Sequence, residues 1–212
     1  MTKFSRVSSW LVAVAIGGAL AAPLVAADQT QKTTACQLRA DMRKLWDDHV
    51  VWTRQWITSF AAGLPDQDAA SARLMQNQVD IGNAIKPYYG EEAGTKLTGL
   101  LKEHIGLAVD LVKAAKGGDA AKIEAAKKKA ADNGDQIATF LSGANPQNWP
   151  LDKMKAALKM HLDTTVQEAT DRLAGKWDAD VKDYDRVKEH IMKMADMLTD
   201  GIVAQHAKEF AG

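Results

Sequence analysis

Residues 45–57, LWDDHVVWTRQWI, place one histidine among three tryptophans at helical spacing. Apolar residues recur in this stretch at spacings of three and four, which is the period of a helix with one buried face. On a helical wheel His49 shares that face with Thr53, Phe60 and the three tryptophans of the stretch. The same period continues along the chain, and no long segment alternates with a period of two. We therefore expect an all-α protein whose core contains a histidine.

Glycine, proline and aspartate divide the chain into about six predicted helices. Three of the breaks combine a glycine that can end a helix in the left-handed conformation with an aspartate that can cap the next helix. They run from Gly63 to Asp66, from Gly118 to Asp119 and from Gly175 to Asp178. The other two breaks, KPYYG and ANPQNWP, contain proline and aromatic residues. The expected helices lie near 36–62, 66–86, 91–116, 119–143, 151–174 and 178–208.

These helices are predicted to form three αα-hairpins that repeat one another. The hairpins would span 36–86, 91–143 and 151–208, within a single up-and-down bundle domain that runs over 28–212. Short connections would bring the three glycine-containing turns to one end of that bundle.

Three histidines follow the repeat. The interval from His49 to His104 is almost the same as the interval from His104 to His161, and each histidine precedes a glycine of its turn by nearly the same interval. At about 1.5 Å of rise per residue, each histidine lies roughly 20 Å from the turn end. We therefore expect the three side chains to form one layer of the core, with His190 and His206 outside it on the surface.

A layer of three neutral imidazoles predicts a metal site, because imidazole is the commonest metal ligand in proteins. The expected ion is a divalent transition metal bound by His49, His104 and His161, zinc or iron in preference to copper. Glu168 and Asp80 are candidate additional ligands. Five further residues are expected to exclude water from the site or to hold its imidazoles: Trp52, Thr53, Asn77, Asn133 and Thr165.

Each of these features also has a structural interpretation. The histidines could form a buried polar layer that specifies packing in a non-enzymatic interaction or stress-related protein. Glu168 could form an ion pair with Arg172, one helical turn further along the same helix. The methionines of the last hairpin could bind copper, although at this spacing they are typical of a core. No substrate or reaction is identified, so the sequence leaves open whether the protein is an enzyme.

Several functional classes are excluded by composition and motifs. The chain carries 27 basic and 27 acidic residues and no strongly basic face, which does not favour nucleic-acid binding. It contains no Gly-rich phosphate loop and no CxxCH motif, so we expect neither a nucleotide cofactor nor haem c. Cys36 is the single cysteine, which rules out an intramolecular disulfide.

The N-terminal segment has the pattern of a secretory signal peptide. Lys3 and Arg6 precede an apolar run, and small residues lead to the sequence VAA that ends at Ala27. Cleavage after Ala27 would place the mature protein in the periplasm or outside the cell, without a stable membrane span.

Four segments carry a resemblance to known sequences: LWDDHVVWTR, IKPYYG, NGDQIATFL with ANP, and MADMLTDGI. Together they resemble an uncharacterised family of small, often exported, bacterial all-helical proteins. The resemblance covers most of the mature chain and implies a helical fold. It implies no activity or ligand.

Overall fold

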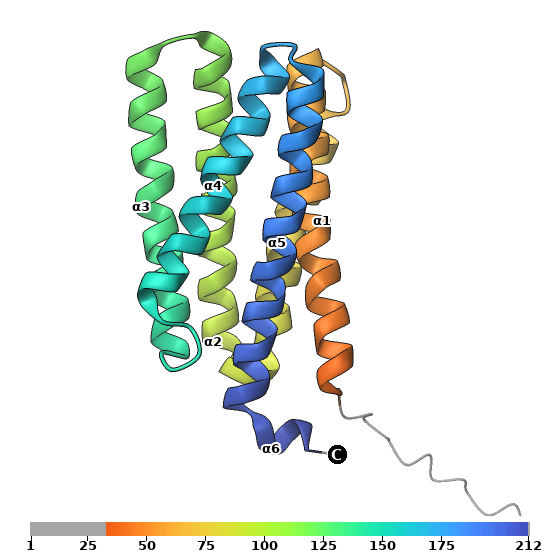
Figure 1. Cartoon of the computed structure of the whole chain (residues 1–212), viewed down its shortest axis with the longest axis vertical. Helices are drawn as coiled ribbons and strands as arrows, with labels where there is room; N and C mark the ends of the chain where they lie inside the picture. The colour runs from red at the N-terminus through yellow and green to blue at the C-terminus, as the bar shows by residue number, and fades with distance from the viewer. Residues whose placement is uncertain (1–32, 212) are drawn as a thin grey trace, which may run out of the picture. The chain divides into compact units, whose positions relative to one another are not determined.

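The computed structural model describes residues 33–211, and the predicted signal segment 1–27 lies outside the described residues. The described chain is an all-helical bundle without a strand, as the apolar period predicts (Figure 1). Its six helices are α1 (Ala35–Ala62), α2 (Gln67–Gly117), α3 (Ala120–Ala144), α4 (Leu151–Leu173), α5 (Trp177–Gln205) and α6 (Ala207–Phe210). None of them is long and apolar enough to cross a membrane.

The helix α2 contains two of the predicted helices, joined at Gly90. Gly90 has φ 86° and ψ 168°, a conformation outside the helical region that glycine adopts without a steric penalty. A Cβ atom placed on Gly94 would lie 2.6 Å from the carbonyl oxygen of Gly82. A straight helix would separate these two residues by about 18 Å. The chain therefore folds back at Gly90, and the two halves of α2 pack closely.

The three glycine-containing turns lie at the same end of the bundle, which is the top in Figure 1. Gly63, Gly118 and Gly175 all have positive φ, between 65° and 71°. The aspartates of these turns differ in whether they cap the helix that follows. The side chain of Asp119 accepts hydrogen bonds from the first backbone N–H groups of α3, whereas Asp66 makes no such bond and Asp178 lies inside α5.

The apolar core of the described chain has two clusters, and polar residues lie between them along the helices. The larger cluster fills the lower part of the bundle, and the smaller one contains Trp56, Ile57 and Ala70. Three buried histidines separate the clusters on α1, α2 and α4. The flanking residues are Trp46 and Trp56 for His49, Leu101 and Val112 for His104, and Leu158 and Ala169 for His161. The core is thus interrupted by a polar layer.

Candidate functional site

Four histidine rings meet in this polar layer. The ring of His161 is central, with its centroid 5.5 Å from that of His49, 6.3 Å from that of His104 and 6.3 Å from that of His190. His49, His104 and His161 are 3%, 6% and 5% exposed. The structure therefore brings together the three predicted histidines and adds a fourth from α5.

Side chains on the returning helices hold two of these rings. The Nδ1 atom of His104 lies 3.0 Å from Oδ1 of Asn133. Because an amide oxygen only accepts hydrogen bonds, Nδ1 of His104 carries the hydrogen and Nε2 keeps its lone pair. Nδ1 of His49 lies 3.3 Å from Nε2 of Gln78. Both amide residues follow their histidine by 29 positions, and His190 follows His161 by the same number.

A second set of hydrogen bonds crosses from the returning helix to the backbone of the histidine-bearing helix. In each case a side chain donates to the carbonyl oxygen one helical turn before the histidine. The bonds are Asn77 to Leu45 (2.9 Å), Asn133 to Leu100 (3.3 Å) and His190 to Ala157 (2.9 Å). His190 thus occupies in the α4 and α5 pair the place that an asparagine has in the other two pairs.

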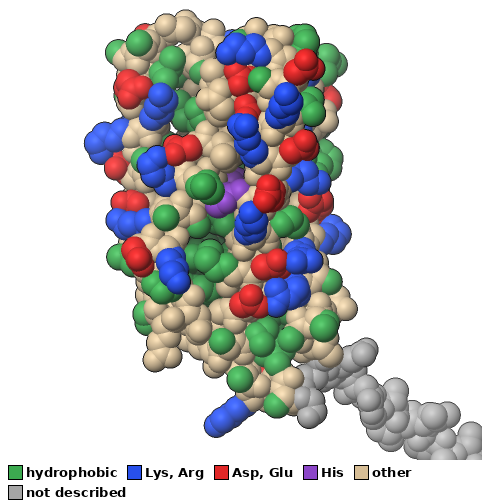
Figure 2. Space-filling view, viewed as in Figure 1, with side chains coloured by type: hydrophobic (Ala, Val, Ile, Leu, Met, Phe, Trp, Pro, Cys, Tyr) green, Lys and Arg blue, Asp and Glu red, His purple; other side chains and the backbone are tan. Residues whose placement is uncertain are grey.

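The prediction that His190 lies on the surface outside the layer is wrong. The side chain is half-buried, and its ring is nearly parallel to that of His161, at an angle of 20°. Histidine surface is visible near the middle of the bundle face, between α4 and α5 (Figure 2). The sequence contains the signal for this position, because the interval that relates His104 to His161 also relates Asn133 to His190. His206 does lie apart from the layer, packed against the rings of Tyr88 and Tyr89.

Burial keeps the three core imidazoles neutral. It lowers the pKa of His49 to about 3, and the repulsion that a protonated His104 would exert acts in the same direction. Burial also lowers the pKa of His104, and together with the neighbouring histidines it holds the pKa of His161 well below its usual range. Neutral imidazole is the form that binds metal ions.

Unpartnered polar atoms collect around the layer. Among residues 33–211 six buried side-chain nitrogen or oxygen atoms have no hydrogen-bond partner. Two belong to Arg73 and His206, and the other four lie in or beside the layer: Trp46 Nε1, Gln78 Oε1, His161 Nδ1 and Thr165 Oγ1. Each such atom costs about 1–3 kcal/mol, so a cluster of them needs a physical explanation.

The candidate ligand Glu168 belongs to a neighbouring ion-pair network. It is 1% exposed and accepts a 2.8 Å hydrogen bond from Arg54 of α1, which also binds Asp180 of α5. The predicted pairing of Glu168 with Arg172 is wrong, because the Arg172 guanidinium binds Asp180 at 3.2 Å. Burial raises the pKa of Glu168 to about 7, although the hydrogen bond from Arg54 opposes the shift.

The other predicted supporting residues differ in their placement. Asp80 accepts a hydrogen bond from Gln76 and pairs with Arg73 at 3.6 Å. Trp52 is half-buried, and its ring lies 5.6 Å from the Arg73 guanidinium carbon. Thr53 donates to the backbone carbonyl of His49, in its own helix. These three side chains are therefore engaged elsewhere, whereas Asn77, Asn133 and Thr165 are buried at the layer.

A groove between α3 and α4 leads from solvent to His104. Its volume is about 590 Å³, which lies in the range of small-molecule sites. Leu111, Ala130, Leu158 and Val166 contribute apolar walls, and charged side chains form the rim. The groove gives one of the layer histidines contact with a space open to solvent.

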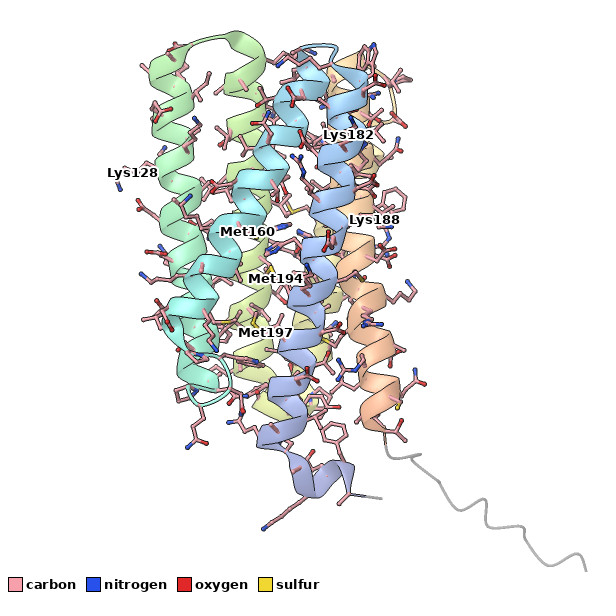
Figure 3. The ribbon with its side chains drawn as sticks, in the orientation of Figure 1. Lys128, Met160, Lys182, Lys188, Met194 and Met197 are labelled. Carbon is pink, nitrogen blue, oxygen red and sulfur yellow. The ribbon has the colours of Figure 1, made fainter. Side chains whose placement is uncertain are left out.

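The methionines of the last hairpin mostly belong to the core. Met154 and Met194 are buried in the larger apolar cluster, and Met197 packs against it (Figure 3). Met160 is 55% exposed on α4. This distribution matches the gap-filling role that the spacing also allows.

In the described part of the chain, no group of three or more His, Cys, Asp or Glu side chains is placed so that it could hold a metal ion. Comparisons with known proteins add no relative: no family model, no curated protein and no solved structure matches the chain.

Proposed function

We propose that this protein binds a divalent transition metal, zinc or iron in preference to copper, at the layer formed by His49, His104 and His161. The observation that carries the proposal is the buried, unpartnered Nδ1 atom of His161, whose ring is surrounded by other imidazoles. A ring nitrogen in that position is costly unless something binds it. A metal ion would bind it and would use the neutral form that burial enforces.

The spacing of the rings supports the proposal. Imidazoles that share one tetrahedral zinc ion have ring centres about 5 Å apart, because each Zn–N bond is about 2.0–2.1 Å long. The spacings of 5.5 and 6.3 Å around His161 are only about an ångström longer. Metal binding would therefore require the side chains to rotate so that their nitrogen atoms converge on a common ion.

The hydrogen bonds of His104 and His49 differ in what they require for metal binding. Asn133 already fixes His104 with its Nε2 lone pair free, which is how ligating histidines are usually held. For His49, Nδ1 lies 3.3 Å from Nε2 of Gln78, an amide nitrogen with two hydrogens that also lies within hydrogen-bond distance of the Leu74 carbonyl and of Asn77 Oδ1. Metal binding through Nε2 would require the Gln78 amide to turn, so that its unpartnered Oε1 accepts from Nδ1 of His49.

Elemental analysis of untagged protein, stripped with a chelator and reloaded with Zn²⁺, tests the proposal. We expect about one equivalent of zinc in the wild type and below about a tenth in His161→Asn. The matched control is His206→Asn, which removes a histidine outside the layer and should retain the metal. His104→Asn serves if His161→Asn does not fold. Zinc at about 1,000 times its Kd should stabilise the wild type by about 4 kcal/mol.

The opposite result would favour the buried polar layer. Wild-type protein that holds less than about a tenth of an equivalent, together with histidine variants that fold and function normally, would contradict the metal proposal. In that case the protein would be a non-enzymatic bundle in which the histidines specify packing.

We also infer that the three hairpins, near 36–86, 91–143 and 151–208, are diverged copies of one unit. The support is the recurrence of the carbonyl hydrogen bond from the returning helix, at sequence separations of 32, 33 and 33 residues. Gln78, Asn133 and His190 also each follow the layer histidine beside them by 29 positions. A repeat explains why three helices present a histidine at the same height.

Residues 1–27 are further proposed to be a cleaved signal peptide, which would place the metal site in the periplasm or outside the cell. The basic start, the apolar run and the VAA sequence support this location. N-terminal sequencing of protein from its native cells should begin at Asp28, and an intact start in a cytosolic fraction would contradict export.

A further inference from the structure

The fourth histidine extends the metal site. We infer that His190 is a ligand of the same ion, so that the site is a set of four imidazoles from α1, α2, α4 and α5. This inference rests on the proposed metal function. It starts from the hydrogen bond between Nε2 of His190 and the carbonyl oxygen of Ala157 at 2.9 Å, and from the 6.3 Å between the rings of His190 and His161.

The hydrogen bond determines which nitrogen of His190 is available. A carbonyl oxygen only accepts, so Nε2 of His190 carries the hydrogen and Nδ1 keeps a lone pair. A ligating histidine commonly donates its other ring N–H to a backbone carbonyl, which orients the ring and raises its basicity. His190 has this arrangement already, and His104 has the corresponding one through Asn133.

The other two pairs of helices show what is special about His190. Asn77 and Asn133 donate to the equivalent carbonyl groups, so an asparagine satisfies the structural requirement at this position. A histidine in the third pair makes the same bond and adds a second ring nitrogen. Packing alone does not need that nitrogen, whereas a four-coordinate metal site does.

The surroundings of His190 fit a ligand that faces solvent. It is half-buried, while the other three rings are almost fully buried. Two acidic side chains of α5 are engaged in ion pairs, since Glu189 pairs with Lys193 and Asp183 with Arg186. The ligand set is therefore composed of imidazole nitrogen atoms, which suit zinc and iron.

The substitution His190→Asn tests this inference with little change in structure. The variant copies the residue at the equivalent positions of the other hairpins and can still donate to the Ala157 carbonyl. We expect it to fold and, in the metal-free form, to melt like the wild type, and to bind Zn²⁺ more than about 100-fold more weakly in calorimetry. X-ray absorption of the wild-type complex should show four nitrogen donors, and that of the variant three nitrogen donors. His206→Asn is the matched control and should leave both measurements unchanged.

The outcomes separate the two proposals. A wild type that binds no Zn²⁺ would overturn the metal function and this inference with it. A wild type that binds Zn²⁺, with His190→Asn matching it in affinity and nitrogen count, would overturn only the role of His190. His190→Ala provides a second variant in case the asparagine amide itself binds the ion, and it should also lose the fourth nitrogen donor.

Discussion

His190 stands to His161 as Asn133 stands to His104, because each follows its partner at the same sequence separation and donates to the carbonyl one helical turn before that partner. The same backbone requirement is thus met by an amide in one hairpin and by an imidazole in another. The polar layer that these residues share, and the ion-pair network beside it, govern how the protein responds to acid and to substitution.

Acid should destabilise the protein below pH 6.5. The pKa of His49 is about 3 in the folded protein and 6.5 for an ordinary exposed histidine, so the unfolded chain binds more protons between these pH values. The contribution of neutral His49 to the free energy of unfolding is therefore fully present above pH 6.5. It decreases as the pH falls, by about 2 kcal/mol at pH 5 for His49 alone. The shifts of His104 and His161 have the same direction. Glu168, with its raised pKa, opposes them.

Urea titrations between pH 5 and pH 7.5 measure this effect. In metal-free protein the pH dependence of His49→Gln should be shallower than that of the wild type by about one proton. Identical slopes for the two proteins would show that His49 is not buried in its neutral form.

Removal of Arg54 should be far more costly than removal of an exposed arginine. Arg54→Met would leave the buried carboxylates of Glu168 and Asp180 without their main partner, at a cost of about 3–5 kcal/mol in the free energy of unfolding. Arg43→Met is the control, because Arg43 is half-exposed and pairs with a partly exposed carboxylate, that of Asp196. Its loss should change the free energy of unfolding little, since solvent screens an exposed ion pair.

Arg54→Met and Arg43→Met should also differ in how their free energies of unfolding change with pH. Arg54 lowers the pKa of Glu168, which is about 7 in the wild type, so in Arg54→Met the pKa lies higher, and a fall in pH from 8 to 6 leaves the carboxyl group protonated, with one of the two unpaired charges removed. Part of the deficit of Arg54→Met should therefore be recovered at pH 6, while Arg43→Met changes little. Equal deficits at both pH values would mean that the Glu168 charge does not limit the stability of the variant.

A methyl group at Gly201 should disturb the packing of Trp149. A Cβ atom there would lie 2.0 Å from Nε1 of Trp149, which is 1% exposed and donates to the carbonyl of Met197. Gly201→Ala should cost about 1–3 kcal/mol in urea unfolding. Gly99→Ala is the matched control, since nothing lies within 4 Å of its Cβ position in α2. It should stabilise the protein by about 0.5–1 kcal/mol, and a similar effect at both glycines would refute the packing argument.

Local features of the fold were accessible from the sequence because they depend on neighbouring residues. The apolar period predicts helices, and the breaks at Gly63, Gly90 and Gly118 follow from backbone preferences that act over a few positions. The aspartates are a weaker signal. A cap needs a particular side-chain rotamer and chain entry, which Asp119 has and Asp178 lacks.

The partners of buried polar groups required the tertiary structure. Glu168 binds Arg54, which is 114 residues away, in place of the nearby Arg172. The choice depends on how α1, α4 and α5 are rotated about their axes, because a buried carboxylate needs a partner that can reach it inside the core. The spacing of residues along one helix does not predict how that helix is rotated relative to its neighbours.

Residue spacing along the chain is enough to predict the helical class, the positions of the turns and a common height for three histidines, since the rise per residue converts a residue count into a distance. Only the tertiary structure decided which side chains meet at that height. In the folded protein His190 lies beside His161, and Asp80 forms an ion pair with Arg73. These contacts depend on the direction of each side chain, which is determined by how whole helices pack against one another.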